Sequence, residues 1–105
     1  MSAWVHLYAT IEFRSKPDIL PQFVFEETYA TLETFEWDQR CPSLIPTEYT
    51  LTIDVRYSDD PQIFMPFMFS LVHRYGAKIS ATIHAETGMD TIGQIYEIDM
   101  NMSEK

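Results

Sequence analysis

The fold is decided by residues 49–85, which read YTLTIDVRYSDDPQIFMPFMFSLVHRYGAKISATIHA. Residues 49–57 alternate apolar and polar side chains, and a period of two is typical of a strand with one buried face. Asp60 before Pro61 is a helix-start signature, because the carboxylate accepts from free N–H groups. Apolar side chains then recur at helical spacing until a glycine ends the pattern. The stretch therefore predicts a helix over 61–75 between two strands.

Period-two alternation also marks residues 4–13 at the N-terminus, 79–86 after the helix and 92–102 near the C-terminus. A strand–helix–strand crossover gives parallel strands, and we expect the N-terminal strand to lie between that pair. The last two strands are expected to form a hairpin with its turn at 87–90. The predicted fold is α+β, a two-layer sandwich with a four- or five-stranded mixed or antiparallel sheet on a ferredoxin-like plan.

Residues 19–38 fit two structures. Several apolar side chains between Leu20 and Phe35 could form a helical stripe, which predicts a second helix over 20–38. Threonine and aromatic residues also gather at the odd-numbered positions, and these residue types favour strands. An irregular strand or hairpin arm is therefore the alternative, and with it the sheet departs from the full ferredoxin order.

Charge and composition exclude several classes of protein. The 105 residues include 16 acids and 7 bases, for a formal net charge of −9. This length predicts a single domain over 1–105, and the acidic balance argues against direct nucleic-acid binding, which needs a basic stripe. No apolar run approaches the roughly 20 residues of a membrane span, and the N-terminus lacks a signal-peptide pattern. We expect a cytoplasmic protein that does not bind membranes.

Few residues are arranged for chemistry. His6 and His84 fall on the same predicted sheet face, where Glu86 or Asp54 could complete a zinc or iron site, but histidines on a half-exposed sheet face are usually just polar surface. The one cysteine, Cys41, lies in a loop, with no catalytic motif around it. The three glycines are isolated, which excludes phosphate-binding loops. We therefore expect no enzymatic activity, no metal and no cofactor.

Acids and apolar side chains together suggest an interface. The segments 17–39 and 79–104 carry acids without a single lysine or arginine, and such a field attracts basic partners and repels nucleic acid. A merely solubilising surface is the alternative. Aromatic and methionine side chains at polar positions are typical of interfaces. The residues predicted to bind a partner are Glu26, Glu27, Glu33, Glu36, Trp37, Asp38, Met65 and Phe69.

Three short motifs carry a resemblance to a known group of proteins. SAWVHL at 2–7, IEF at 11–13 and FEWD at 35–38 resemble small uncharacterised acidic accessory proteins of tailed bacteriophages, whose later strand–helix–strand half is similar to 49–85. Their glycine-rich central turn is replaced here by CPSLIP at 41–46. The resemblance implies a phage accessory protein made in the host cytoplasm, and it carries no catalytic residues.

These observations lead to one principal hypothesis and two alternatives. The principal hypothesis is a phage inhibitor that occupies a basic, nucleic-acid-binding surface of a host protein such as a defence complex. The first alternative is a structural module that self-associates, for example as a homodimer, through the sheet face or an edge strand. The second is a small-ligand binder or enzyme with a pocket between helix and sheet near Cys41 and His73.

Overall fold

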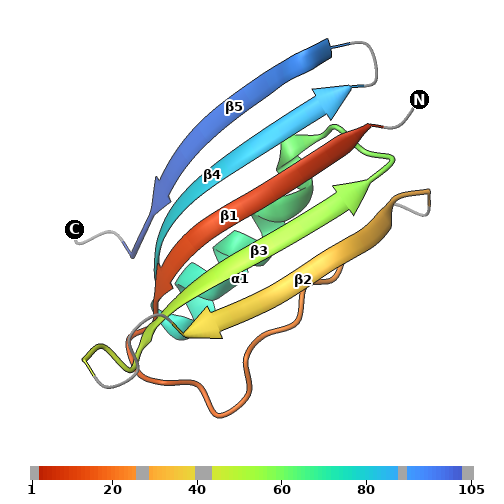
Figure 1. Ribbon diagram of the computed structural model, residues 1–105. Coiled ribbons are helices and arrows are strands. Elements are labelled where there is room, and N and C mark those ends of the chain that lie inside the picture. The colour runs from red at the N-terminus through yellow and green to blue at the C-terminus, as the bar shows by residue number, and fades with distance from the viewer. Residues whose placement is uncertain (1–2, 26–28, 40–43, 88–89, 103–105) are drawn as a thin grey trace.

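Five strands and one helical segment make up the computed structural model, which describes residues 3–25, 29–39, 44–87 and 90–102 (Figure 1). A 3₁₀ turn, η1, leads directly into the helix α1, so the helical segment covers 61–75 as predicted. The elements in chain order are β1 (Trp4–Glu12), β2 (Thr31–Gln39), β3 (Glu48–Arg56), η1 (Pro61–Phe64), α1 (Met65–Tyr75), β4 (Lys78–Thr87) and β5 (Asp90–Met100).

The strands form one sheet in the order β2-β3-β1-β4-β5. Every neighbouring pair is antiparallel. Because β1 is antiparallel to both β3 and β4, the two strands that η1 and α1 connect are parallel to each other. The prediction that the N-terminal strand lies between this parallel pair is therefore confirmed, and so is the predicted pairing of the last two strands.

The core lies between α1 and one face of the sheet, with α1 behind the strands in Figure 1. The β1 residues that point toward α1 are no more than 1% exposed, and their cross-strand partners on β3 and β4 are buried with them. Each of the larger apolar side chains among them, such as Leu7 and Ile53, contributes about 1.5–3 kcal/mol when it is buried. The buried side chains of α1 are Phe67, Met68, Leu71 and Val72.

Local interactions set both ends of the helical segment. Asp60 Oδ1 accepts a hydrogen bond from the backbone N–H of Gln62 at 3.0 Å, as the helix-start signature predicts. At the other end Gly76 adopts a left-handed conformation with φ 63°, and its N–H donates to the carbonyl of Val72 at 3.1 Å. Glycine accepts this conformation without steric cost, so the chain can turn directly into β4.

The predicted second helix over 20–38 is wrong, and the strand alternative is correct. The described residues between β1 and β2 are irregular, and residues 31–39 form the edge strand β2. In strand form Phe35 and Trp37 lie opposite Ile53 and Leu51 of β3, where their aromatic rings pack on the sheet. The register shifts between Leu32 and Thr34, which is a β-bulge or similar irregularity. The sheet therefore departs from the full ferredoxin order.

An aromatic cluster closes the core beside β2. Phe23 is only 6% exposed, although it belongs to an irregular segment. Its ring centroid lies 5.6 Å from that of Phe64, 5.4 Å from that of Phe67 and 6.3 Å from that of Phe35. The segment that the sequence left ambiguous therefore covers the core with side chains rather than with a second helix.

Candidate functional site

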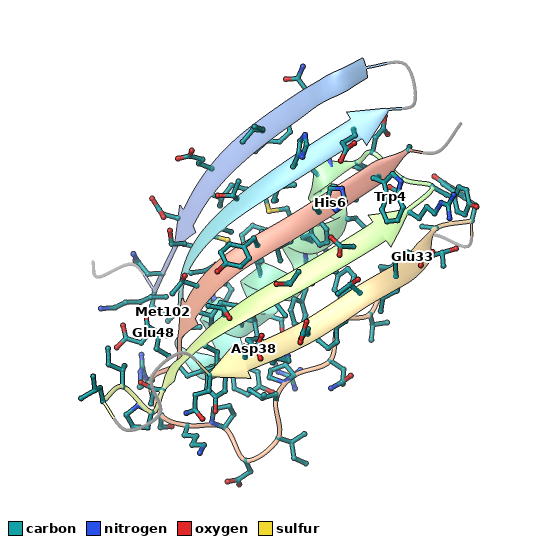
Figure 2. The ribbon with its side chains drawn as sticks, in the orientation of Figure 1. Trp4, His6, Glu33, Asp38, Glu48 and Met102 are labelled. Atoms are coloured by element: carbon teal, nitrogen blue, oxygen red, sulfur yellow. The ribbon has the colours of Figure 1, made fainter. Side chains whose placement is uncertain are left out.

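The face of the sheet opposite α1 is the candidate site, and we call it the open face. In the described part of the chain, no helix or strand lies over it (Figure 1). Figure 2 shows its side chains projecting toward the viewer, among them Trp4, His6, Asp38 and Glu48. The alternation that buries every second residue of β1, β3 and β4 against α1 places the remaining residues on this face.

Two rows of cross-strand partners span the open face from one edge to the other. Each row begins with a carboxylate on β2, ends with a carboxylate on β5, and has hydroxyl-bearing side chains between them. Neighbouring strands lie about 4.8 Å apart, so four intervals separate the two edges by about 19 Å. The rows are Glu36–Thr52–Tyr8–Thr82–Glu97 and Asp38–Thr50–Thr10–Ser80–Asp99.

We call Glu36 with Asp38 the β2 rim, and Glu97 with Asp99 the β5 rim. All four side chains are exposed. The β2 rim comes from the first base-free segment of the sequence and the β5 rim from the second, so the fold brings the two acidic segments to opposite edges of one surface. The floor between the rims is polar apart from the ring of Tyr8, which is 58% exposed.

The central strands add further acids to the open face. Asp54 and Glu48 of β3, Glu12 of β1 and Glu86 of β4 share it, according to the strand register. In the described strands Arg56 and Lys78 are the basic residues on this face. The predicted set of partner-binding residues missed these central acids, because only the strand order and register show that they share the open face with the rims, beyond either end of the two rows. Their alternation with the core residues was the available signal.

The structure separates the predicted partner-binding residues. Glu33, Glu36 and Asp38 are exposed on β2, whereas Glu26 and Glu27 lie outside the described residues. Trp37 points to the α1 side of the sheet, where its Nε1 donates to the carbonyl of Pro21 at 3.0 Å. Its ring packs against Phe13, Phe35 and Tyr49. Trp37 is therefore partly buried on the α1 side of the sheet, away from the face that Glu36 and Asp38 share.

The two apolar residues predicted on the helix are also remote from the rims. Met65 is half-buried against the core, and Phe69 is 49% exposed with its ring stacked on His73. Both belong to α1, on the opposite side of the sheet from the open face. The predicted acids and the predicted apolar anchors thus do not form one surface.

A network around His6 occupies the end of the open face where β1 begins. His6 Nδ1 lies 2.7 Å from Asp54 Oδ1, and His6 Nε2 lies 2.8 Å from Glu86 Oε2. The indole of Trp4 stacks on the imidazole with an interplanar angle of 9° and a centroid distance of 5.5 Å. The guanidinium of Arg56 lies 5.4 Å from the centre of the Trp4 ring.

The predicted approach of His6, His84, Asp54 and Glu86 is therefore confirmed, with the rings of the two histidines 5.9 Å apart. The described residues contain no group of three or more histidine, cysteine or acidic side chains spaced to hold a metal ion. Both ring nitrogens of His6 already contact carboxylates. In this arrangement the four residues form a polar network across β3, β1 and β4.

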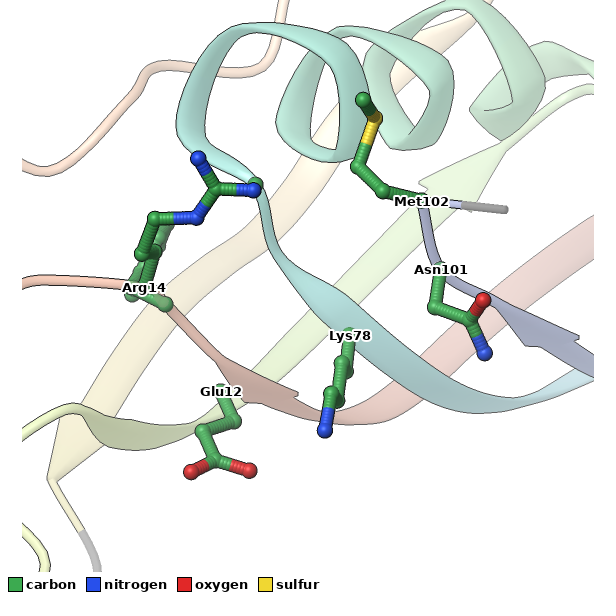
Figure 3. A pocket seen from close by; sticks show the side chains of 7 residues that line it. Glu12, Arg14, Lys78, Asn101 and Met102 are labelled. Atoms are coloured by element: carbon green, nitrogen blue, oxygen red, sulfur yellow. The ribbon is translucent and has the colours of Figure 1, made fainter. Parts of the chain in front are cut away.

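A hollow of about 520 Å³ lies elsewhere, at the end of the sheet near Gly76. Figure 3 shows Arg14 extending toward the end of α1, while Glu12 and Lys78 project away from it. The described residues that line this hollow include Glu12, Arg14, Lys78 and Asn101 but no serine, cysteine or histidine. A neighbouring hollow of about 260 Å³ includes His73, and Cys41 lies outside the described residues.

Comparison with known proteins found no match among family models, curated proteins or solved structures. The described residues include no helix with the length and apolar character needed to cross a membrane. The open face, with its two rims and the network around His6, is therefore the candidate site on geometric grounds alone.

Proposed function

We propose that this protein binds a basic surface of another protein through its open face and catalyses no reaction. The observation that supports the proposal is the pair of acidic rims on either side of a polar floor. Residues two apart on a strand lie about 7 Å from each other, within a Debye length of about 8 Å at physiological salt. The fields of neighbouring carboxylates therefore add, and they complement a surface rich in lysine and arginine.

The proposed partner surface is one that normally binds nucleic acid. Such surfaces place lysine and arginine where they contact phosphates, which they neutralise. Two lines of carboxylates about 19 Å apart, with hydroxyl groups between them, offer negative charges that such a surface could bind in place of phosphates. The resemblance of the sequence to phage accessory proteins suggests a host protein, such as a defence complex, as the target. Occupying its basic channel would inhibit it.

Capture from a bacterial lysate tests the proposal. The immobilised protein should retain one or a few basic proteins at low salt and lose them as ionic strength rises, because exposed charge pairs are screened. An excess of DNA or RNA should also release the retained protein, since the nucleic acid and the immobilised protein would compete for the same basic surface of the retained protein. Retention that is insensitive to salt and to nucleic acid would argue against binding through the rims.

Self-association is a second candidate, supported by one observation. β5 is an edge strand from Asp90 to Met100, and it exposes Ile95 (63%) and Tyr96 (40%). Exposed edge strands pair with other strands unless charges or other features block them. Glu97 and Asp99 oppose pairing between two copies of the chain, so we rank this candidate second. Sedimentation equilibrium distinguishes the two, because the principal proposal predicts a monomer.

A further inference from the structure

The outer edge of β5 is unpaired in the described part of the chain, where β4 is its neighbour on one side and no strand lies on the other. The backbone N–H and C=O groups of alternate β5 residues therefore point away from the sheet. Figure 1 shows β5 at the outer edge of the sheet, beyond α1. Such an edge can accept one more strand through main-chain hydrogen bonds.

The side chains of β5 divide into two kinds, according to their partners on β4. Three apolar residues lie opposite β4 residues that are buried on the α1 side, and two acids lie opposite hydroxyl-bearing residues of the open face. Tyr96 is 40% exposed, and the other two apolar side chains are only partly buried. A strand added at this edge therefore meets apolar side chains on one face and carboxylates on the other. The apolar residues are Tyr96, Ile98 and Met100, and the acids are Glu97 and Asp99.

The opposite edge strand, β2, differs because the chain that precedes it covers its α1 side. The ring of Phe23 stacks on that of Phe35 with centroids 6.3 Å apart, and Trp37 Nε1 donates to the carbonyl of Pro21 at 3.0 Å. In Figure 1 no described segment outside the sheet lies alongside β5 in this way. Of the two edges, β5 therefore leaves the larger part of its apolar side available for a partner.

We propose that the edge of β5 binds an extended segment of a partner protein in which apolar residues alternate with lysine or arginine. This inference rests on the proposed function, since it names the form in which a basic partner is bound. The apolar residues of the segment pack on Tyr96, Ile98 and Met100, and its basic residues face Glu97 and Asp99. The rest of the partner then lies over the open face, toward the β2 rim.

Charge decides which strand this edge accepts. Opposite charges on neighbouring strands stabilise the pair, and like charges destabilise it. Glu97 and Asp99 therefore disfavour pairing with a second copy of β5, which brings the same carboxylates, and they favour a basic strand. Lys78 lines one hollow with Asp99 and offsets part of this charge. Ile95, which is 63% exposed, ends the acidic pattern on the open face of β5.

A peptide titration followed by NMR tests the inference. The probe is a synthetic peptide of alternating lysine and valine, about nine residues long as an ordinary strand is, added to the ¹⁵N-labelled protein. We expect the largest amide shifts between Gln94 and Met100, and new protection of alternate amides there from exchange with D₂O. Shifts that are largest on β1 and β3, or no shifts at millimolar peptide, would overturn the inference.

Two control peptides separate strand pairing from attraction by charge alone. One has the same composition with its valines and lysines in separate blocks, and the other alternates glutamate with valine. We expect both to bind at least about tenfold more weakly than the first peptide, because neither matches both faces of β5. Equal binding of the blocked peptide would mean that charge alone holds it, and strand pairing at β5 would be rejected.

Matched variants of the protein locate the peptide at one edge. Glu97→Gln with Asp99→Asn removes two charges from the β5 rim, whereas Glu36→Gln with Asp38→Asn removes two from the β2 rim. The β5 pair should weaken binding of the alternating peptide about fivefold, and the β2 pair less than about twofold. Equal losses would place the peptide across the open face and contradict docking at the edge of β5.

A failure at β5 would leave the proposed function standing. The basic protein captured from the lysate would then lose affinity equally in the two matched variants, whereas strand pairing at β5 predicts the larger loss for the β5 pair. Capture that is insensitive to salt and to nucleic acid would instead reject the proposed function, whatever the peptides do.

Discussion

The two faces of this sheet are built from the same strands and differ in almost every physical respect. In β1 the residues that face α1, from Val5 to Ile11, are buried apolar side chains, and the intervening residues are aromatic, polar or charged. The α1 face gains free energy by excluding water. The open face instead gathers carboxylates on neighbouring strands, which contributes nothing to a hydrophobic core. The stability of the fold and the proposed binding therefore depend on alternate residues of the same strands.

Truncating one apolar side chain on each face should show the largest difference. Leu7→Ala removes a side chain that is 1% exposed, and it should lower the free energy of unfolding by about 2–5 kcal/mol. Ile95→Ala removes a similar volume on the open face, where Ile95 is 63% exposed, and should cost at most about 1 kcal/mol. Urea unfolding measures both. Equal losses would mean that the open face is covered in solution.

The two tryptophans lie on different faces of the sheet, Trp37 on the α1 side and Trp4 on the open face. Trp37→Ala removes a ring that packs against three aromatic neighbours on the α1 side, together with its hydrogen bond to Pro21, and should cost about 3 kcal/mol. Trp4→Ala on the open face removes a stacked but partly exposed ring and should cost less than half as much. Chemical denaturation of both variants decides the order, and a larger loss for Trp4 would contradict it.

A smaller effect is expected at the start of the helical segment, which covers only one of the two faces. Asp60→Ala removes the acceptor for the N–H of Gln62 and should cost about 1 kcal/mol. Asp59→Ala is the matched control, because Asp59 is exposed and its change removes the same charge. Its effect should stay within about 0.5 kcal/mol. If Asp59→Ala were as costly, the loss would reflect charge rather than capping.

Patterns along the chain predict one layer of the molecule better than the other. Alternation and helix-start residues such as Asp60 and Pro61 predicted four strands, the helical segment and the central place of β1. The helix predicted over 20–38 is wrong because residues such as Tyr29 and Phe35 fit a helical stripe and a strand equally well. The strand is favoured because residues 31–39 can pair with the edge of β3, which the sequence pattern alone does not show.

The candidate site was harder to predict, for a physical reason. Glu36 and Glu97 lie at opposite ends of one row because of the strand order. This order depends on segments that are distant from one another in the sequence. The contacts of His6 with Asp54 and Glu86 depend on the register of three strands. Alternation places such residues on a face but does not say which strand lies beside which. The acids beside Trp37 in the sequence suggested that it is exposed and could anchor a partner. The alternation along β2 instead places its side chain on the core side of the sheet, opposite Leu51.

The most direct test of the open face as a binding surface compares two variants of equal charge. Glu36→Gln with Glu97→Gln removes one carboxylate from each rim, whereas Asp18→Asn with Asp59→Asn removes two exposed carboxylates outside the strands. Neither pair should change the free energy of unfolding by more than about 1 kcal/mol. The measurement is the affinity of each variant for the basic protein captured from the lysate. We predict a loss of at least about tenfold for the rim pair and little change for the control pair. Equal affinities for the two variants would contradict binding through the rims.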